Sequence, residues 1–308
     1  MTELRFDGRT AIVTGSGGNP SLGRAHAMLL AARGANVVVN DVGGDPAARG
    51  YAGTASAEAV AEEIRALGGK AVADTHSVAT EDGAEALIRT AIDAFGAVDI
   101  LINNAAICIM AWMDEMTSAD YRRHIEVNLM GPVWTSRAAW PHMRKAGYGR
   151  IVNIGSAGFT GIALLGAYGV SKGGVFSLSR TLAAEGASHG IKANTVNPLA
   201  FTRMLASQQK ESSSLYQEAK ANLAAELVSP VVAFLAHESC PVSGECIDAA
   251  GGHVARTYLA QSAGIDDKRL TIETLADRWG EVMDEAGGHV LAHGATDPST
   301  WDVKPYQP

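Results

Sequence analysis

Short segments that are apolar at nearly every position alternate with helical patterns along most of this chain. Strands buried between two layers of helices have this continuous apolar character, whereas half-exposed strands alternate apolar and polar residues. Regular alternation of strands with helices indicates a parallel sheet. We therefore predict a doubly wound α/β fold, with helices on both faces of the sheet. The expected strands are Thr10–Val13, Asn36–Asn40, Lys70–Ala73, Asp99–Ile102, Arg150–Ile154, Lys192–Val196 and Glu245–Ile247.

The segments between these strands have helical spacing, and one of them carries a capping signal. The hydroxyl of Thr117 can cap a helix that begins there, with Asp120 three residues further on. A chain of 308 residues, 47% hydrophobic and 19% charged, suffices for one large core. We predict a single domain over residues 1–264 and a C-terminal extension over residues 265–308. The other expected helices are Gly23–Arg33, Ala57–Leu67, Glu81–Phe95 and Tyr168–Ser188.

The extension is more polar than the rest of the chain, yet it carries one apolar stripe. Leu275, Trp279 and Met283 are spaced i, i+4 and i+8, so they would share one face of a helix. An apolar stripe of this kind needs a surface to cover it. We expect it to pack on the body of the chain or on a partner subunit.

A glycine-rich turn, Gly15 to Gly23, joins the first strand to the first helix. Such a turn lets the phosphates of a dinucleotide approach backbone N–H groups at a helix N-terminus. The second strand ends at Asp41, whose carboxylate can accept hydrogen bonds from both ribose hydroxyls and would repel a 2′-phosphate. No lysine or arginine lies within the turn. These features predict NAD rather than NADP, although an ordinary turn residue is the alternative interpretation of Asp41.

Three polar residues predict proton transfer at the same edge of the sheet. Tyr168 and Lys172 are one helical turn apart, and Ser156 closes the fifth strand. A phenol has a pKa of about 10, so it acts as a base near neutrality only when a neighbouring cation stabilises its anion. Ligands of open α/β sheets bind at the carboxyl ends of the strands, where all three residues are expected. A Tyr-x-x-x-Lys pair alone also arises by chance. The hypothesis therefore depends on the expected position of the three residues at the carboxyl ends of the strands.

Further short motifs follow the later strands. The motifs are Asn103-Asn104-Ala105-Ala106 after the fourth strand, Val127-Asn128-Leu129, and Asn197-Pro198 at the sixth. Together with the glycine turn and the Ser156, Tyr168 and Lys172 set, they make residues 5–255 resemble the short-chain dehydrogenase/reductase family. The resemblance implies a Rossmann fold, a homodimer or homotetramer, and an oxidoreductase that acts on CH–OH donors.

A closer resemblance is to the (3R)-hydroxyacyl-CoA dehydrogenase part of the peroxisomal multifunctional β-oxidation enzymes. It rests on the phrases Val37–Asp45, Glu62–Val72, Arg137–Trp140, Gly149–Ile151 and His237–Cys240. The extension is similar too, more faintly.

Resemblance assigns a role to each residue of the predicted site. Ser156 would hold the substrate oxygen and Tyr168 would exchange its proton. Lys172 would lower the tyrosine pKa and bind the nicotinamide ribose, and Asn128 would order a water in the proton relay. The expected cofactor contacts are Gly15, Gly17, Ser21, Leu22, Gly23, Asp41, Ser77, Val78, Asn104, Ala105, Tyr168, Lys172, Pro198 and Thr202.

The chain departs from the family pattern in the cofactor region. The segment Asn19-Pro20-Ser21 lengthens the glycine turn, so Ser21 stands where a glycine is usual, as in the enoyl reductases of fatty acid synthesis. Ala106 also replaces a glycine, and His76 replaces the aspartate that contacts adenine. These departures affect the expected geometry of the phosphate turn and the expected adenine contacts. None of them removes Ser156, Tyr168 or Lys172, so the predicted reaction type is unchanged.

Charge and cysteine content exclude several classes of function. A net charge of −8 without a run of lysines or arginines argues against nucleic acid or a membrane surface as a partner. The N-terminus has no apolar signal core, and we expect a cytoplasmic protein. The three cysteines include no Cys-x-x-Cys pair, and neither His237 with Cys240 nor His289 with His293 has further ligands at metal-binding spacing. We therefore expect no metal and a small-molecule substrate.

The function predicted from the sequence is NAD-dependent interconversion of a secondary alcohol and a ketone, with a 3-hydroxyacyl-CoA as the first substrate hypothesis. A steroid or cyclic-alcohol dehydrogenase is the alternative, and a non-catalytic dinucleotide-binding regulator is an alternative of another class. Coenzyme A carries several phosphates, so a thioester enzyme needs basic groups at the rim of its cleft. The candidates are Arg203, Lys210, Arg122 and Arg123, for which solvated surface charges are the alternative interpretation.

Overall fold

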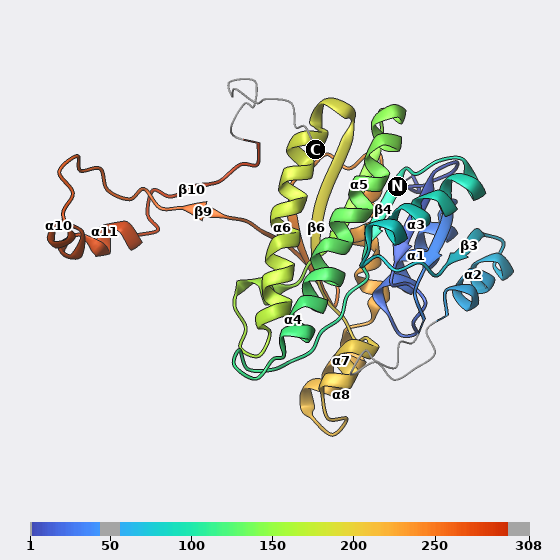
Figure 1. Cartoon of the computed structure of the whole chain (residues 1–308), viewed down its shortest axis with the longest axis horizontal. Helices are drawn as coiled ribbons and strands as arrows, with labels where there is room; N and C mark the ends of the chain where they lie inside the picture. Colours follow the sequence, from blue (N-terminus) through green and yellow to red (C-terminus); the bar gives the residue numbers. More distant parts are fainter. Residues whose placement is uncertain (1, 44–55, 295–308) are drawn as a thin grey trace. The chain divides into compact units, whose positions relative to one another are not determined.

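An eight-stranded sheet in the order β3-β2-β1-β4-β5-β6-β7-β8 forms the centre of the molecule (Figure 1). The computed structural model describes residues 2–43 and 56–294. All seven strands expected from the sequence are present, with ends that differ by a few residues. They are β1 Thr10–Thr14, β2 Asn36–Asn40, β3 Lys70–Asp74, β4 Ile100–Asn103, β5 Gly149–Ile154, β6 Ile191–Leu199 and β7 Cys246–Ala250.

The first seven strands are parallel, and the order of the sheet reverses at β1. This strand pairs with β2 on one side and with β4 on the other, both in parallel register. The crevice of a doubly wound sheet opens at such a switch point, beside the carboxyl ends of the strands. The sequence did not predict β8 (His253–Thr257), which follows β7 after a two-residue turn of Gly251 and Gly252, both with positive φ. A connection this short joins antiparallel neighbours.

Helices cover both faces of the sheet, as predicted. On one face α1, α2 and α9 pack through side chains such as Leu30, Ile64 and Val232. On the other face α3, α5 and α6 pack through Leu87 and Met143, among others. The helices of this part are α1 Leu22–Ala32, α2 Ala57–Ala66, α3 Glu81–Phe95, α4 Ser118–Ile125, α5 Gly131–Ala146, α6 Gly166–Gly186, α7 Arg203–Gln208, α8 Ser214–Asn222 and α9 Ser229–Ala236.

Hydroxyl side chains determine where several helices begin. Thr117 accepts a hydrogen bond from the backbone N–H of Asp120 at 3.1 Å, which confirms the predicted cap of α4. Ser21 accepts one from the N–H of Arg24 at 3.2 Å and caps α1. Between α4 and α5 the chain forms a π-helical turn, Glu126–Met130, of a kind that often occurs at functional sites. The turn carries Asn128.

The chain divides into two compact units, residues 1–256 and 257–308. The boundary predicted at residue 264 lies inside the second unit, and the predicted extension is described as far as residue 294. Elements of the second unit are short: β9 Ala260–Gln261, α10 Ile272–Asp277, α11 Trp279–Met283 and β10 His289–Val290. Strands β9 and β10 form an antiparallel pair.

The apolar stripe predicted in the extension is divided between two short helices. The segment breaks at Arg278 into α10 and α11 instead of forming one helix. Trp279 and Met283 are 52% and 63% exposed. Sequence spacing alone could not reveal this break, because Arg278 fits a helix by propensity.

Within the described residues no single helix is long and apolar enough to cross a membrane.

Candidate active site

Strand β5 and helix α6 bring Ser156, Tyr168 and Lys172 together. The hydroxyl of Ser156 hydrogen-bonds the phenol of Tyr168 and also accepts the backbone N–H of Gly158 at 3.0 Å. The ammonium nitrogen of Lys172 lies 5.6 Å from the centroid of the Tyr168 ring and donates to the carbonyl oxygen of Ile154 at 2.5 Å. One turn of α6 thus places the phenol and the ammonium at the carboxyl end of β5, as the spacing indicates.

Burial governs the charges of this group. Removal of water from around the phenol raises the pKa of Tyr168 well above its ordinary value, and the hydrogen bond from Ser156 opposes this rise. Burial also lowers the pKa of Lys172 to about 8. The unliganded chain therefore holds the phenol protonated, while Lys172 remains mostly protonated at neutral pH. The positive charge of Lys172 beside the phenol favours loss of the phenol proton.

The side chain of Asn128 is engaged by the backbone rather than open to the pocket. Its oxygen accepts the N–H of Ile107 at 2.8 Å, and its nitrogen donates to the carbonyl of Ile107 at 2.9 Å and to Ser171 Oγ at 3.3 Å. His124, fully buried one turn earlier, accepts the N–H of Ile109 at 2.9 Å. These two side chains fix the segment after β4 beside the catalytic group. The water-ordering role of Asn128 stays a prediction.

This fixed segment brings Cys108 into the site, which the sequence interpretation missed. The thiol is buried and close enough to interact electrostatically with both Tyr168 and Lys172. Burial raises the pKa of the thiol, and the neighbouring Gln208 of α7 partly opposes this rise. Its place in the sequence could have indicated this, because Cys108 follows the end of β4, where ligands of this fold bind.

Close backbone packing forms the glycine-rich turn. Gly15 has a φ of +64°, and a Cβ there would lie 2.7 Å from the Cα of Ala105. A Cβ on Gly23, in the first turn of α1, would lie 2.4 Å from the carbonyl oxygen of Gly15. Ser21 donates to the carbonyl of Gly18 at 2.8 Å and so closes the lengthened turn as the cap of α1. Leu22 is the first residue of α1. These contacts leave backbone groups at the N-terminus of α1 free to face a phosphate.

The end of β4 holds the turn in position. Asn104 donates from its side-chain nitrogen to the carbonyls of Thr14 and Gly15, at 2.9 and 3.0 Å. The hydroxyl of Thr14 accepts the N–H groups of Asn104 and Ala105, each at 3.0 Å. Asn104 and Ala105 therefore shape the predicted cofactor site through the backbone.

Asp41 follows β2 and lies against the turn, as expected. One carboxylate oxygen accepts the N–H of Gly17 at 2.9 Å, and the other accepts the N–H of Gly43 at 3.0 Å. The basic residue closest in sequence to the turn, Arg24, is engaged elsewhere, because Glu63 forms an ion pair with it. The turn therefore has a carboxylate on the side where the second strand ends.

The remaining predicted contacts lie at the carboxyl ends of strands. Ser77 and the buried Val78 follow β3, and Pro198 is the residue before the last of β6. Thr202 caps α7 by accepting the N–H of Leu205 at 3.3 Å. All four belong to the edge of the sheet that also carries the glycine turn and Tyr168.

A family comparison agrees with this geometry. The model of the short chain dehydrogenase family matches residues 9–213, which contain the glycine turn and the Ser156, Tyr168 and Lys172 set. The chain belongs to the short-chain dehydrogenase family. Members bind a nicotinamide dinucleotide and act on small molecules, and the close-packed turn at the N-terminus of α1 fits such a cofactor.

Relatives of this short-chain dehydrogenase match almost all of the chain. It is 41% identical over 284 residues to a short-chain type dehydrogenase/reductase of Mycobacterium tuberculosis, covering 92% of this chain and 96% of the relative. It is 40% identical over 289 residues to the peroxisomal multifunctional enzyme type 2 of Drosophila melanogaster, covering 92% and 46%. The chain thus spans somewhat less than half of the Drosophila enzyme. The resemblance to multifunctional β-oxidation enzymes is confirmed.

Solved structures give the same result. The full-length Drosophila enzyme superposes with a TM-score of 0.77 at 33% identity, over 94% of this chain and 48% of that one. A short chain dehydrogenase from Mycobacterium avium also gives 0.77, at 34% identity, over 94% and 99%. The predicted Rossmann fold is confirmed.

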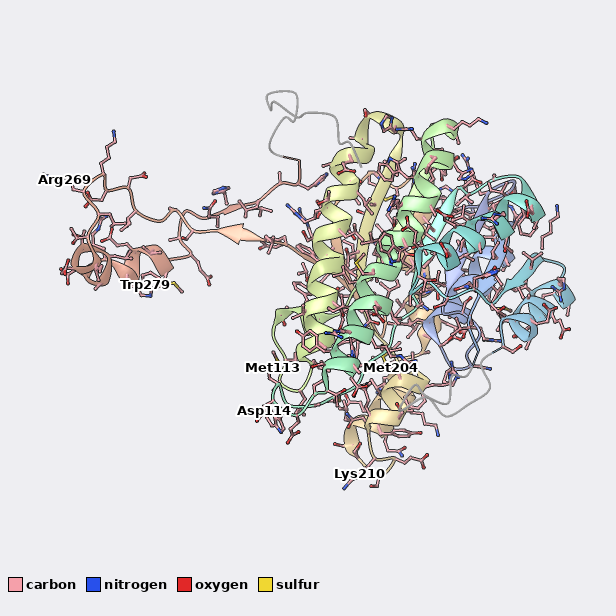
Figure 2. All side chains as sticks on the ribbon, in the orientation of Figure 1. Met113, Asp114, Met204, Lys210, Arg269 and Trp279 are labelled. Atoms are coloured by element: carbon pink, nitrogen blue, oxygen red, sulfur yellow. The ribbon has the colours of Figure 1, made fainter. Side chains whose placement is uncertain are left out.

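The basic residues considered for coenzyme A do not gather at one place on this short-chain dehydrogenase. Lys210 is exposed at the outer tip of the segment between α7 and α8 (Figure 2). The guanidinium of Arg203 instead lies over Gly18 of the glycine turn. Arg122 and Arg123 lie on α4, where Arg122 is exposed.

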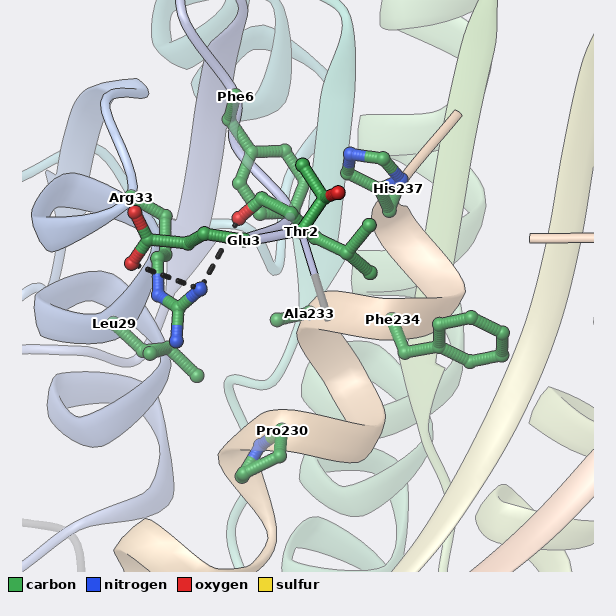
Figure 3. A pocket seen from close by; sticks show the side chains of 10 residues that line it. Thr2, Glu3, Phe6, Leu29, Arg33, Pro230, Ala233, Phe234 and His237 are labelled. Atoms are coloured by element: carbon green, nitrogen blue, oxygen red, sulfur yellow. Dashed lines mark hydrogen bonds and ion pairs between the residues drawn. The ribbon is translucent and has the colours of Figure 1, made fainter. Parts of the chain in front are cut away.

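One hollow of this dehydrogenase lies away from Ser156, Tyr168 and Lys172. A hollow of about 500 Å³ between the N-terminal segment and α9 is lined by Phe6, Leu29, Phe234 and His237, with Arg33 paired to Glu3 at its mouth (Figure 3). None of the predicted catalytic residues lines it. Within residues 2–43 and 56–294, no three His, Cys, Asp or Glu side chains are placed to hold a metal ion.

Proposed function

We propose that this short-chain dehydrogenase uses NAD to interconvert a secondary alcohol and a ketone, and that its substrate is a 3-hydroxyacyl-CoA. The hydrogen bond between Ser156 and Tyr168, with the ammonium of Lys172 beneath the phenol ring, carries the proposal. A hydroxyl that holds the substrate oxygen, a phenol that exchanges its proton and a cation that stabilises the phenolate suffice for the acid–base part of the reaction. The bound dinucleotide supplies the hydride chemistry.

The chain's own residues would move one proton. In the oxidation direction, the substrate hydroxyl donates a hydrogen bond toward the Tyr168 oxygen while Ser156 Oγ holds the substrate oxygen from the other side. As the phenolate, Tyr168 takes the proton while the C–O bond gains double-bond character, and in reduction the neutral phenol returns a proton to the same oxygen. Because burial disfavours the phenolate, Lys172 stabilises it by remaining protonated while the phenol ionises.

The contacts of the turn support NAD as the cofactor. The carboxylate of Asp41 accepts the N–H of Gly17, so it lies where the adenosine ribose of a Rossmann cofactor is expected. A 2′-phosphate there would face this carboxylate. Arg24 could not readily compensate, because its guanidinium is paired with Glu63.

Two observations support the thioester substrate. The relatives that match over more than nine-tenths of this chain include enzymes named peroxisomal multifunctional enzyme type 2 and peroxisomal hydratase-dehydrogenase-epimerase. Exposed apolar side chains of the loop before α4 also border the loop before α6, since Ala111 bonds the carbonyl of Leu164 at 3.0 Å. An acyl chain could pack on this surface, which includes Met110, Trp112, Met113 and Ile162. A steroid ring system could use the same apolar surface, so it remains the second candidate.

Initial rates separate these candidates. The purified protein would be given NAD or NADP with (3R)- and (3S)-hydroxyacyl-CoA esters of several chain lengths and with hydroxysteroids, and nicotinamide reduction would be followed by absorbance. We expect the highest kcat/KM for NAD with one stereochemical series of hydroxyacyl-CoA. Preference for hydroxysteroids would contradict the thioester assignment. Binding of NADH without turnover of any alcohol would favour a regulator that only senses the dinucleotide.

A further inference from the structure

Helix α7 connects the glycine-rich turn to the catalytic pocket. At its beginning, the backbone N–H of Arg203 donates to the carbonyl of Pro20 in the turn at 3.2 Å. At its end, Gln208 lies close enough to Cys108 to affect the pKa of the thiol, and Cys108 lies beside Tyr168 and Lys172. A single short helix therefore touches both halves of the site.

The guanidinium of Arg203 occupies the space above Gly18. A Cβ added to Gly18 would lie 2.1 Å from one terminal nitrogen of Arg203 and 2.7 Å from its Nε. A side chain at position 18 would therefore displace the guanidinium. Gly18 does not have a positive φ, so the absence of a Cβ matters here for space rather than for backbone conformation.

This guanidinium has no partner that explains its position. Its Nε is buried and forms no hydrogen bond, and among residues 2–43 and 56–294 no carboxylate forms an ion pair with Arg203. A buried N–H donor without a partner is costly, because it has lost its hydrogen bond with water. By contrast, Arg24 on the other side of the turn is paired with Glu63. Within residues 2–43 and 56–294, Arg203 is thus a cation at the turn that has no ion-pair partner.

We propose that Arg203 binds the pyrophosphate of the dinucleotide and thereby ties α7 to the bound cofactor. The fold positions the pyrophosphate at the N-terminus of α1, next to Gly18. A guanidinium forms two parallel, charge-assisted hydrogen bonds with phosphate oxygens, which a lysine cannot reproduce. Because Gln208 lies on the same helix, occupancy of the cofactor site holds α7 against the catalytic pocket.

Equilibrium binding tests this assignment without any substrate. Dissociation constants for NADH would be measured by fluorescence titration, and those for ADP-ribose and adenosine by competition, in the parent, Arg203→Gln and Lys210→Gln. The two variants lose the same charge, and Lys210 is exposed at the tip of the same segment. Loss of a hydrogen bond to a charged group predicts a rise of about ten- to hundredfold for NADH and ADP-ribose in Arg203→Gln. Adenosine binding and the Lys210→Gln variant should be unchanged.

Two further measurements distinguish the loss of a phosphate contact from misfolding of the Arg203→Gln variant. The affinity of Arg203→Gln for NADH should fall less steeply with added salt than that of the parent, because one phosphate contact is missing. Gly18→Ala keeps the arginine but displaces its guanidinium, so it should also weaken NADH binding. In the Arg203→Gln background, Gly18→Ala should add little.

Two results would overturn the assignment. One is unchanged NADH affinity in a folded Arg203→Gln protein. If the KM for a hydroxyacyl-CoA also rose in this variant, Arg203 would be assigned to substrate binding instead. The other is an equal loss of affinity for adenosine and ADP-ribose, which would indicate a general disturbance of the fold.

Discussion

The side-chain nitrogen of Asn104 lies 3.0 Å from the carbonyl oxygen of Gly15, so the end of β4 holds the turn that precedes α1. Asn104→Ala should therefore weaken NADH binding and lower the melting temperature together. Leaving a partly buried carbonyl without its donor costs about 1–3 kcal/mol. Fluorescence titration and thermal unfolding would measure both effects. The exposed Asn222→Ala serves as the control, and an Asn104→Ala protein with parental NADH affinity would show that the turn holds its shape unaided.

Tyr168→Phe removes the transferable proton and keeps the ring. We expect kcat to fall by about 10²- to 10⁴-fold, the range for loss of general acid–base catalysis, with NADH affinity nearly unchanged. Stopped-flow rates and NADH titration measure these quantities. Tyr148→Phe is the matched control, because its phenol lies among Arg9, Arg150 and Asp99, away from the catalytic group. Substantial activity in Tyr168→Phe would refute the proposed proton transfer.

Asp41→Asn separates charge from hydrogen bonding at the turn. An amide oxygen can still accept the N–H of Gly17, whereas the charge opposing a 2′-phosphate is gone. The ratio of kcat/KM for NAD to that for NADP should shrink by at least about tenfold, equivalent to 1.4 kcal/mol. Initial rates with NAD and with NADP, measured at several salt concentrations, would give this ratio for the parent and for Asp41→Asn. A parent enzyme that already uses both equally would contradict the role assigned to Asp41.

His26 makes the stability of the protein depend on pH. Its ring is fully buried, Nδ1 contacts Ser229 Oγ at 2.8 Å, and Nε2 has no partner. Burial lowers the pKa of His26 from 6.5 to about 3, so between these values the unfolded chain binds a proton that the folded chain does not. The free energy of unfolding should fall by about 1.4 kcal/mol per pH unit as pH decreases below 6.5.

Urea unfolding at a series of pH values would measure this contribution. His26→Leu should flatten the slope in that window, while His142→Leu, at an exposed histidine, should leave it as in the parent. An identical slope in His26→Leu would assign the acid sensitivity to other groups.

Trp279 and Met283 remain exposed on α11, and apolar side chains of this size favour a covering surface. We expect Trp279→Ser with Met283→Ser, or truncation after Gly264, to change the oligomer or lower the melting temperature. Light scattering coupled to size exclusion and thermal unfolding would detect this. If truncated and full-length chains share the same mass and melting temperature, the extension is dispensable for both.

The sequence by itself determined the sheet and the proximity of Tyr168 to Lys172, because both depend on local spacing. Continuous apolar runs identified β1 to β7, and the four-residue step from Tyr168 to Lys172 placed both on one face of α6. Two elements were not predicted correctly, because residue spacing in the sequence did not determine them. The helix expected across Leu275 to Met283 divides at Arg278, and β8 was not recognised.

Only the tertiary structure decided which residues meet across the sequence. Cys108 reaches the catalytic group because Asn128 and His124 hold the segment after β4. Arg203, one of four candidates for a coenzyme A contact, lies over Gly18, and the backbone at the start of α7 bonds Pro20. Contacts between residues far apart in the chain depend on packing and on where buried polar groups find partners, and neither is encoded in a local pattern.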